Sequence, residues 1–178
     1  EFMPHLIATF RPDYVVGSVH FVSDLGFDYS REQYEQTAAA VGGKDEMYCR
    51  YFDQQYEMIG LLKPSVVGHF DLIRIFDPDY KARLLQPEIM VRIKRNLLLI
   101  KDLDLIMDFN LRSLLKGADE PYISRKILEM AREMDIAVVP GDDSHGVANV
   151  GANMETAKAI LSEMGFDTNW REPKLLQY

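Results

Sequence analysis

Three of the four histidines in this 178-residue chain follow short apolar stretches. His20 ends "VVGSVH", His69 ends "SVVGH", and His145 follows "AVVPGDDS". Neutral imidazole is a common metal ligand, and Asp143 adds a carboxylate two residues before His145. On an extended backbone, residues two apart point to the same side of the chain. These residues predict a metal site if the elements that carry them end at one place.

Each acidic or basic residue near these histidines also has an ordinary structural interpretation. Asp142 is expected to accept backbone N–H bonds at the following turn, as Asp often does. Asp71 and Asp108 stand at predicted strand ends, where each is either a partner of a metal ligand or a turn residue. Arg74 has two interpretations, a phosphate contact through its planar guanidinium or a surface ion pair.

The elements that would position these residues follow a strand–helix alternation. Ser30 and Gln33 have the spacing of a capping box, which predicts a helix start. Strands separated by helices predict an α/β fold with a parallel sheet, and chemistry in such folds collects at the carboxyl ends of the strands. The predicted strands are residues 13–22, 65–73, 104–110 and 136–143, and the helical patterns cover residues 30–41, 45–62, 86–100, 121–134 and 154–165.

Composition excludes several classes of protein. Apolar residues make up 47% of the chain, which argues against a disordered segment, and no apolar run is long enough to cross a membrane. The net charge of -8 argues against a nucleic-acid partner. One cysteine, Cys49, and the lack of a signal-peptide pattern predict a cytoplasmic protein without a disulfide framework.

Four stretches of the chain resemble a known family. They are "PDYVVGSVHFV", "YFDQQYEMIGLLKPSVVGHFDLIRIF", "MDFNLRSLLKGADEPYIS" and "GDDSHGVANVG". In this order they are similar to the histidinol-phosphate phosphatases of the PHP (polymerase and histidinol phosphatase) superfamily, over most of residues 13–165. The resemblance implies a distorted, TIM-like (β/α)7 barrel with metal ions at the carboxyl ends of its strands. Residues 1–178 would form the C-terminal part of one such domain, with about four β/α units.

The resemblance also implies roles for individual residues. His20 matches the metal ligand of "GSVH", His69 that of "GHFD", and Asp143 and His145 the terminal "DxH" pair. Arg74 is similar to a basic position after "GHFD" and is the expected catalytic contact to phosphate. Two or three divalent ions of zinc, manganese or iron would activate water to hydrolyse L-histidinol phosphate to L-histidinol and phosphate, a reaction of histidine biosynthesis.

This chain departs from the family pattern in two places. The family begins with an "HxH" strand and supplies further histidines and a glutamate before "GSVH", and none of these precedes His20 here. The family also has an arginine where this chain has Leu115, whereas Arg112 lies three residues earlier. We therefore expect the N-terminal "HxH" part to be absent from this chain, and strand 13–22 to lie at an unpaired sheet edge.

Two alternatives to a histidinol-phosphate phosphatase remain open at the level of the sequence. One is a PHP phosphoesterase that acts on another phosphate ester, because no residue identifies a histidinol pocket. The other is an inactive half-barrel that only associates with a missing segment. In either case the expected partner at the sheet edge is the missing N-terminal segment or another copy of the chain.

Overall fold

The centre of the fold is a sheet of four parallel strands. The computed structural model describes residues 2–178. In order across the sheet, the strands are β1 (Val16–Gly17), β4 (Val66–Val67), β5 (Ile106–Asn110) and β6 (Ala137–Gly141). All three neighbouring pairs are parallel. This arrangement confirms the predicted α/β class and places the carboxyl ends of the strands at one edge.

The first predicted strand is wrong in its length. The structure divides residues 13–22 into β1 and a separate strand, β2 (Phe21–Val22), which pairs antiparallel with β3 (Leu25–Gly26). The turn between β2 and β3 has positive φ at Ser23 (51°) and Asp24 (64°). This turn reverses the chain, so that Phe21 and Val22 pair with β3 and not with the parallel sheet.

The second predicted strand is also too long. Only Val66 and Val67 of residues 65–73 are in the sheet, and Leu72–Arg74 form a 3₁₀ helix, η1. Between them His69 has a positive φ of 21°, which is incompatible with an extended strand. Phe70 is fully buried all the same. Its apolar character therefore reflects packing in the core and not membership of a strand.

Helices connect the strands, largely where the sequence predicts them. The Ser30 hydroxyl accepts the Gln33 N–H at 3.1 Å, as the capping spacing predicts. No helix within residues 2–178 is long and apolar enough to span a membrane. The helices are α1 (Phe2–Phe10), α2 (Arg31–Val41), α3 (Lys44–Leu62), α4 (Tyr80–Leu84), α5 (Pro87–Asp102), α6 (Arg112–Leu115), α7 (Arg125–Glu133), the 3₁₀ helix η2 (Val147–Asn149) and α8 (Met154–Glu163).

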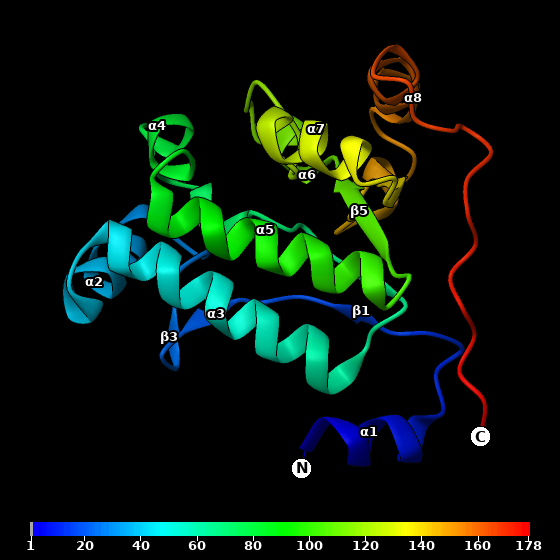
Figure 1. The fold of residues 1–178 in the computed structure, drawn as a ribbon, viewed down its shortest axis with the longest axis horizontal. Coiled ribbons are helices and arrows are strands. Elements are labelled where there is room, and N and C mark those ends of the chain that lie inside the picture. The colour runs from blue at the N-terminus through cyan, green and yellow to red at the C-terminus, as the bar shows by residue number, and fades with distance from the viewer. Residues whose placement is uncertain (1) are drawn as a thin grey trace.

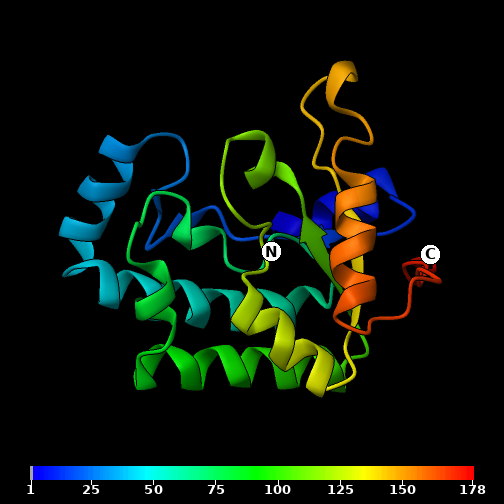
Figure 2. The same ribbon diagram turned by 90° about the horizontal axis from the view of Figure 1, so that it is seen from above.

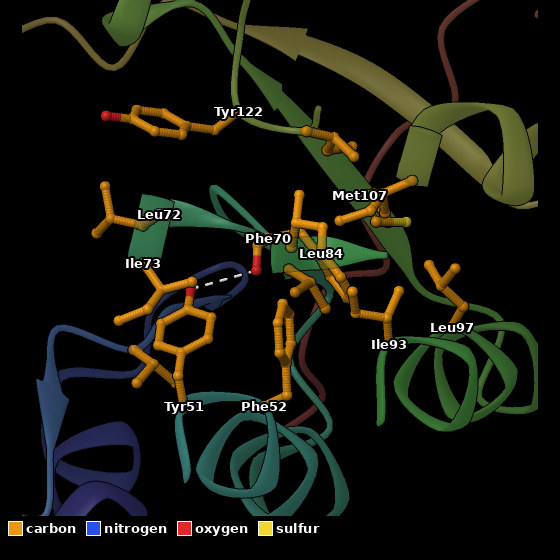
Figure 3. Close-up of a cluster of buried hydrophobic side chains, with 14 of the residues drawn as sticks. Tyr51, Phe52, Phe70, Leu72, Ile73, Leu84, Ile93, Leu97, Met107 and Tyr122 are labelled. Atoms are coloured by element: carbon orange, nitrogen blue, oxygen red, sulfur yellow. Dashed lines mark hydrogen bonds between the residues drawn. The ribbon is translucent and has the colours of Figure 1, made fainter. Parts of the chain in front are cut away.

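The main core lies between the sheet and two long helices. Helices α3 and α5 run side by side (Figures 1 and 2) and share the most extensive helix–helix contact. Phe52 of α3, Ile93 of α5 and Met107 of β5 face one another in this core (Figure 3) and are fully buried. Burying each such side chain stabilises the fold by about 1.5–3 kcal/mol. The Tyr51 hydroxyl donates a 3.2 Å bond to the Phe70 carbonyl.

Glycines allow the first strands to approach their neighbours closely. A Cβ atom at Gly17 would lie 2.6 Å from the Met58 sulfur, and one at Gly68 would overlap the Ser18 hydroxyl. A side chain at either position would have to displace these neighbouring atoms. Strand β1 has a partner on one side only, and Val16 remains 51% exposed. The predicted edge is thus present, with β6 as the other outer strand.

The C-terminal segment after α8 crosses the opposite ends of the strands. The Asp104 carboxylate, just before β5, accepts hydrogen bonds from Arg171 at 2.6 Å and Lys174 at 2.7 Å. The Leu176 N–H donates to the Asp13 carbonyl at 2.7 Å. Figure 1 shows this segment running along one side of the molecule toward α1. It joins the last element of the chain to the segment that leads into β1.

Candidate metal centre

One cavity at the carboxyl ends of the strands collects the polar residues that could do chemistry. Its volume is about 1000 Å³, and the sheet strands form one of its walls. The four sequence-predicted ligands all line it, from three separate stretches of the chain. The polar lining includes His20, Asp28, His69, Asp108, Asn110, Arg112, Lys116, Asp142, Asp143 and His145. The structure therefore brings the predicted ligands to one place, as parallel strands that end together would.

His20 and His69 form the first close pair. Their ring centroids are 4.8 Å apart, with the rings almost perpendicular. His20 lies between β1 and β2, and its Nδ1 atom is 2.7 Å from an oxygen of Asp28. This hydrogen bond holds the pKa of the Asp28 carboxyl below its ordinary value. A carboxylate on one ring nitrogen fixes the imidazole and leaves the other nitrogen free to bind a metal.

The imidazole of His69 is buried and neutral. His69 is 8% exposed. Its burial, and to a smaller extent the nearby His20, lowers the pKa of the imidazole to about 4. Its Nδ1 atom is buried and has no hydrogen-bond partner among residues 2–178. A buried polar atom without a partner is costly unless a ligand or water satisfies it. A neutral imidazole with a free nitrogen has the chemistry that a divalent metal needs.

Asp143 and His145 form the second pair, beyond the end of β6. The His145 Nε2 atom lies 3.4 Å from an Asp143 oxygen, and the Asn110 side-chain nitrogen donates a hydrogen bond to Asp143 at 3.2 Å. The backbone here is not extended as the sequence predicts, because Asp143 has a φ of 49°. Aspartate tolerates this left-handed conformation better than most residues. The two side chains still meet, through a turn rather than through strand alternation.

The two pairs do not by themselves make a complete metal-binding cluster. Within residues 2–178, no three His, Cys, Asp or Glu side chains are arranged closely enough to hold one ion. Three imidazoles and a carboxylate are nevertheless the donors that zinc, manganese and iron accept. The donor atoms are of the types that bind a divalent metal. Too few of them lie close together, within residues 2–178, to form a complete metal site.

Asp142 and Asp71 have structural roles. Asp142 accepts the Ser144 N–H at 3.2 Å and the Gly151 N–H at 2.5 Å, which confirms its predicted place at a turn. Asp71 is fully buried, and burial raises the pKa of its carboxyl. It accepts the Ser124 N–H at 2.9 Å, away from the cavity. Neither carboxylate is therefore a candidate ligand.

Arg74, the predicted phosphate contact, lies in the interior and not in the cavity wall. It is 5% exposed and donates to the Pro121 carbonyl at 2.6 Å, with Asp71 3.3 Å from its Nε atom. Its guanidinium also stacks on the rings of Tyr80 and Tyr122. The guanidinium is enclosed by protein groups outside the cavity lining, so this placement favours a structural role over the predicted contact with phosphate.

Two other cations line the cavity instead. Arg112 opens α6 directly after β5, and Lys116 follows that helix. The Arg112 Nε atom is buried and has no hydrogen-bond partner among residues 2–178. An unpaired guanidinium nitrogen beside candidate metal ligands is suited to a phosphate oxygen. The sequence indicated Arg112 only indirectly, because it lies three residues before Leu115, the position at which the family usually has an arginine.

Asp108 is a buried acid that the sequence left without a definite role. Burial raises its pKa to about 6, although hydrogen bonds from Asn110 and from the His69 backbone lower it in part. Its carboxylate lies against Gly141 of β6, where any Cβ atom would overlap it. Asp28 is the other cavity acid that pattern alone missed, because it reaches His20 from the chain after the β2–β3 hairpin.

Comparison with known proteins gives related sequences and a related structure. The chain is 32% identical over 168 residues to a protein of Schizosaccharomyces pombe named as a histidinol-phosphatase. That match covers 93% of this chain and 55% of the yeast protein. A histidinol-phosphatase of Saccharomyces cerevisiae is 29% identical over 174 residues, covering 85% of this chain and 52% of that protein.

The structural match agrees with the sequence matches. A crystal structure of a Listeria monocytogenes protein described as a histidinol phosphatase superposes with a TM-score of 0.76 and 30% identity. This chain is similar to the histidinol phosphatases in sequence and in fold. The structural match covers 87% of the chain and 62% of the Listeria protein, and the chain spans about half the length of the curated relatives it matches. No protein-family model matches it.

Proposed function

We propose that this chain forms the C-terminal part of a metal-dependent phosphatase that hydrolyses L-histidinol phosphate. The observation that carries the proposal is the meeting of His20, His69, Asp143 and His145 in one cavity of a chain similar to the histidinol phosphatases. Histidine and carboxylate ligands at the carboxyl ends of parallel strands are a usual arrangement for a hydrolytic metal site.

In this proposal each pair of side chains holds part of a centre with two or three ions. His69 supplies a neutral nitrogen, while Asp28 orients His20. Asp143 and His145 supply an oxygen and a nitrogen from the segment that follows β6. Bound divalent ions supply Lewis acidity that activates water and stabilises charge on phosphoryl oxygens. The remaining ligands would come from residues outside positions 1–178.

The phosphate group of the substrate would lie next to Arg112 and Lys116. Their positive charges stabilise the charge that builds on the equatorial oxygens during transfer to water. The Arg112 guanidinium has an unpaired buried nitrogen for this purpose. The organic part of the substrate would occupy the rest of the cavity, whose 1000 Å³ is ample for a small ester.

The finer fold in this proposal is the open part of a PHP-type barrel. Four parallel strands leave β1 and β6 as outer strands, and Val16 at the β1 edge is half exposed. A further strand-bearing segment could pair with the free edge of β1 and carry the missing ligands. The proposed partners are therefore L-histidinol phosphate and either an N-terminal segment of the same domain or another copy of the chain.

A second candidate function follows from the incomplete ligand set. Because the described residues hold no group of three clustered ligands, the chain alone would associate with its missing partner segment and have no activity of its own. This candidate shares the fold of the first and differs in whether the completed domain is a phosphatase. An assay of a protein that contains the complete domain distinguishes the two, because only the first candidate predicts that this protein releases phosphate.

The test is release of inorganic phosphate from L-histidinol phosphate in the presence of Mn²⁺ or Zn²⁺. We expect turnover by a protein that carries this chain within a complete domain. His69→Ala should lower turnover by about 10–100-fold or more, because a lost ligand disturbs both the ion and the water it activates. His5→Ala, in exposed helix α1, is the matched control and should be fully active. Undiminished turnover by His69→Ala would contradict the proposal.

A further inference from the structure

Asn110 occupies a position that links two carboxylates of the cavity. It is the last residue of β5 and only 2% exposed. Its side-chain nitrogen donates to Asp108 at 2.9 Å and to Asp143 at 3.2 Å. Its side-chain oxygen accepts the Arg112 N–H at 3.0 Å. Carboxylates accept and a backbone N–H donates, so these three bonds fix which amide atom is nitrogen and which is oxygen.

The two carboxylates that Asn110 joins differ in how firmly they are held. Asp108 lies within β5, packed against Gly141 of the paired strand so closely that a Cβ there would overlap it. Asp143 lies beyond the end of β6, with a side chain 36% exposed and a left-handed φ of 49°. Asn110 therefore connects a rigid part of the sheet to a residue on a turn.

We propose that Asn110 is a positioning residue that holds Asp143 in one orientation, facing His145 and the cavity. Through this orientation it sets how tightly the candidate centre binds a divalent ion. The second statement rests on the proposed function, whereas the first concerns only the protein without metal. An outer hydrogen bond that orients a ligand typically changes metal affinity by about 10–100-fold.

The chemistry of this position requires an asparagine. The side chain must donate twice and accept once, at the length of one methylene, and only the asparagine amide does so. An aspartate would keep the acceptor for Arg112 but place a third carboxylate between Asp108 and Asp143. A serine could make at most one of the two donated bonds. Asn110→Asp therefore keeps an acceptor for the Arg112 N–H and removes the hydrogen bond to Asp143. Asn110→Ser keeps at most one of the two hydrogen bonds to the carboxylates.

The first measurement uses the metal-free chain. Three-bond couplings to the Asp143 β protons report its χ1 rotamer by nuclear magnetic resonance. We expect one rotamer in the unmodified protein and averaging over rotamers in Asn110→Ala, Asn110→Asp and Asn110→Ser. Asn96→Ala, which removes another buried amide bonded to Phe52 and Gln55, should leave Asp143 in a single rotamer. Any one of the three Asn110 variants that folds supplies the readout.

The second measurement is the affinity for Mn²⁺ by calorimetry. Asn110→Ala should weaken binding by about 10-fold or more, and Asn96→Ala should leave it unchanged. A single Asp143 rotamer in the Asn110 variants overturns the positioning role, and unchanged Mn²⁺ affinity in them overturns the effect on metal binding. If the unmodified protein binds no Mn²⁺, the proposed function loses its support and so does the second statement. The rotamer measurement still decides whether Asn110 positions Asp143.

Discussion

At the scale of single residues, the chemistry of the cavity depends on which side chains have partners. Asp28 fixes His20 through a 2.7 Å bond, whereas His69 and Arg112 each have a buried nitrogen without a hydrogen-bond partner in residues 2–178. Groups of this kind are rare in folded proteins unless a ligand completes them. The Nε atom of Arg74 is buried without a hydrogen-bond partner among these residues as well, but it lies 3.3 Å from Asp71 and outside the lining of the cavity.

Arg112 is predicted to contact the phosphate group. Arg112→Ala should raise the inhibition constant for inorganic phosphate, because a charge-assisted bond contributes about 1.5–3 kcal/mol, or roughly 10–100-fold in binding. Arg125→Ala, which removes an exposed arginine paired with Glu129 on α7, is the matched control. The measurement is competitive inhibition of phosphate release by a protein with the complete domain. Equal inhibition constants for the Arg112 variant and the unmodified protein would exclude this contact.

Residue type made part of the site predictable from the sequence. His20, His69, Asp143 and His145 could be proposed because histidine and aspartate after apolar runs are few and chemically distinctive. Asp28 could not, since it meets His20 through the β2–β3 hairpin. The burial of Arg74 could not be predicted, because periodicity does not show that Tyr80 and Tyr122 enclose its guanidinium.

At the scale of elements, helices were predictable and strand lengths were not. The spacing of apolar residues and the cap at Ser30 gave α2 nearly to the residue. Residues 13–22 and 65–73 look like long strands because Val19, Val22 and Phe70 are buried. Burial makes a loop under packed helices as apolar as a strand, and only the tertiary structure distinguishes them.

The C-terminal segment provides a prediction for acid pH. Hydrogen bonds from Arg171 and Lys174 lower the pKa of Asp104 to about 2. A depressed folded-state pKa stabilises the attached segment above the ordinary value near 3.8, and that stabilisation is lost as pH falls toward 2. Hydrogen exchange at the Leu176 amide should therefore accelerate over this range relative to its intrinsic rate.

Asp104→Asn should remove this particular pH dependence. The variant should show faster exchange at Leu176 already at neutral pH, because an amide holds the two cations less strongly than a carboxylate does. Asp135→Asn, which removes an exposed acid with a longer 3.7 Å pair to Lys101, is the control and should exchange as the unmodified protein does. A variant at Asp104 that retains the acid transition would contradict the assignment.

At the scale of the whole molecule, the sheet has a free edge beside an open cavity. Strand β1 pairs with β4 alone, and Val16 and Phe21 near this edge are both more than half exposed. Unpaired backbone groups on an apolar edge strand favour association with another strand. The sequence indicated this edge through the absent "HxH" strand, and the four-stranded order agrees with that expectation.

We therefore predict that purified residues 1–178 self-associate unless a further segment of the domain covers β1. Light scattering should give a mass above that of the 20.5 kDa chain. Val16→Lys, which places a charge on the edge strand, should shift the population toward the monomer. Val91→Lys, at an exposed valine of α5 away from the edge, should not. A stable monomer at high concentration would show that the edge needs no partner.

The central claim is that His20, His69, Asp143 and His145 bind divalent metal in the cavity. The most direct measurement is an anomalous difference map from crystals of the protein in Mn²⁺, collected at an energy where manganese scatters anomalously. The account predicts a peak within about 2–2.5 Å of a His20 or His69 nitrogen, or of an Asp143 oxygen or His145 nitrogen. Saturating Mn²⁺ with no peak in this cavity, or peaks only elsewhere, would contradict it.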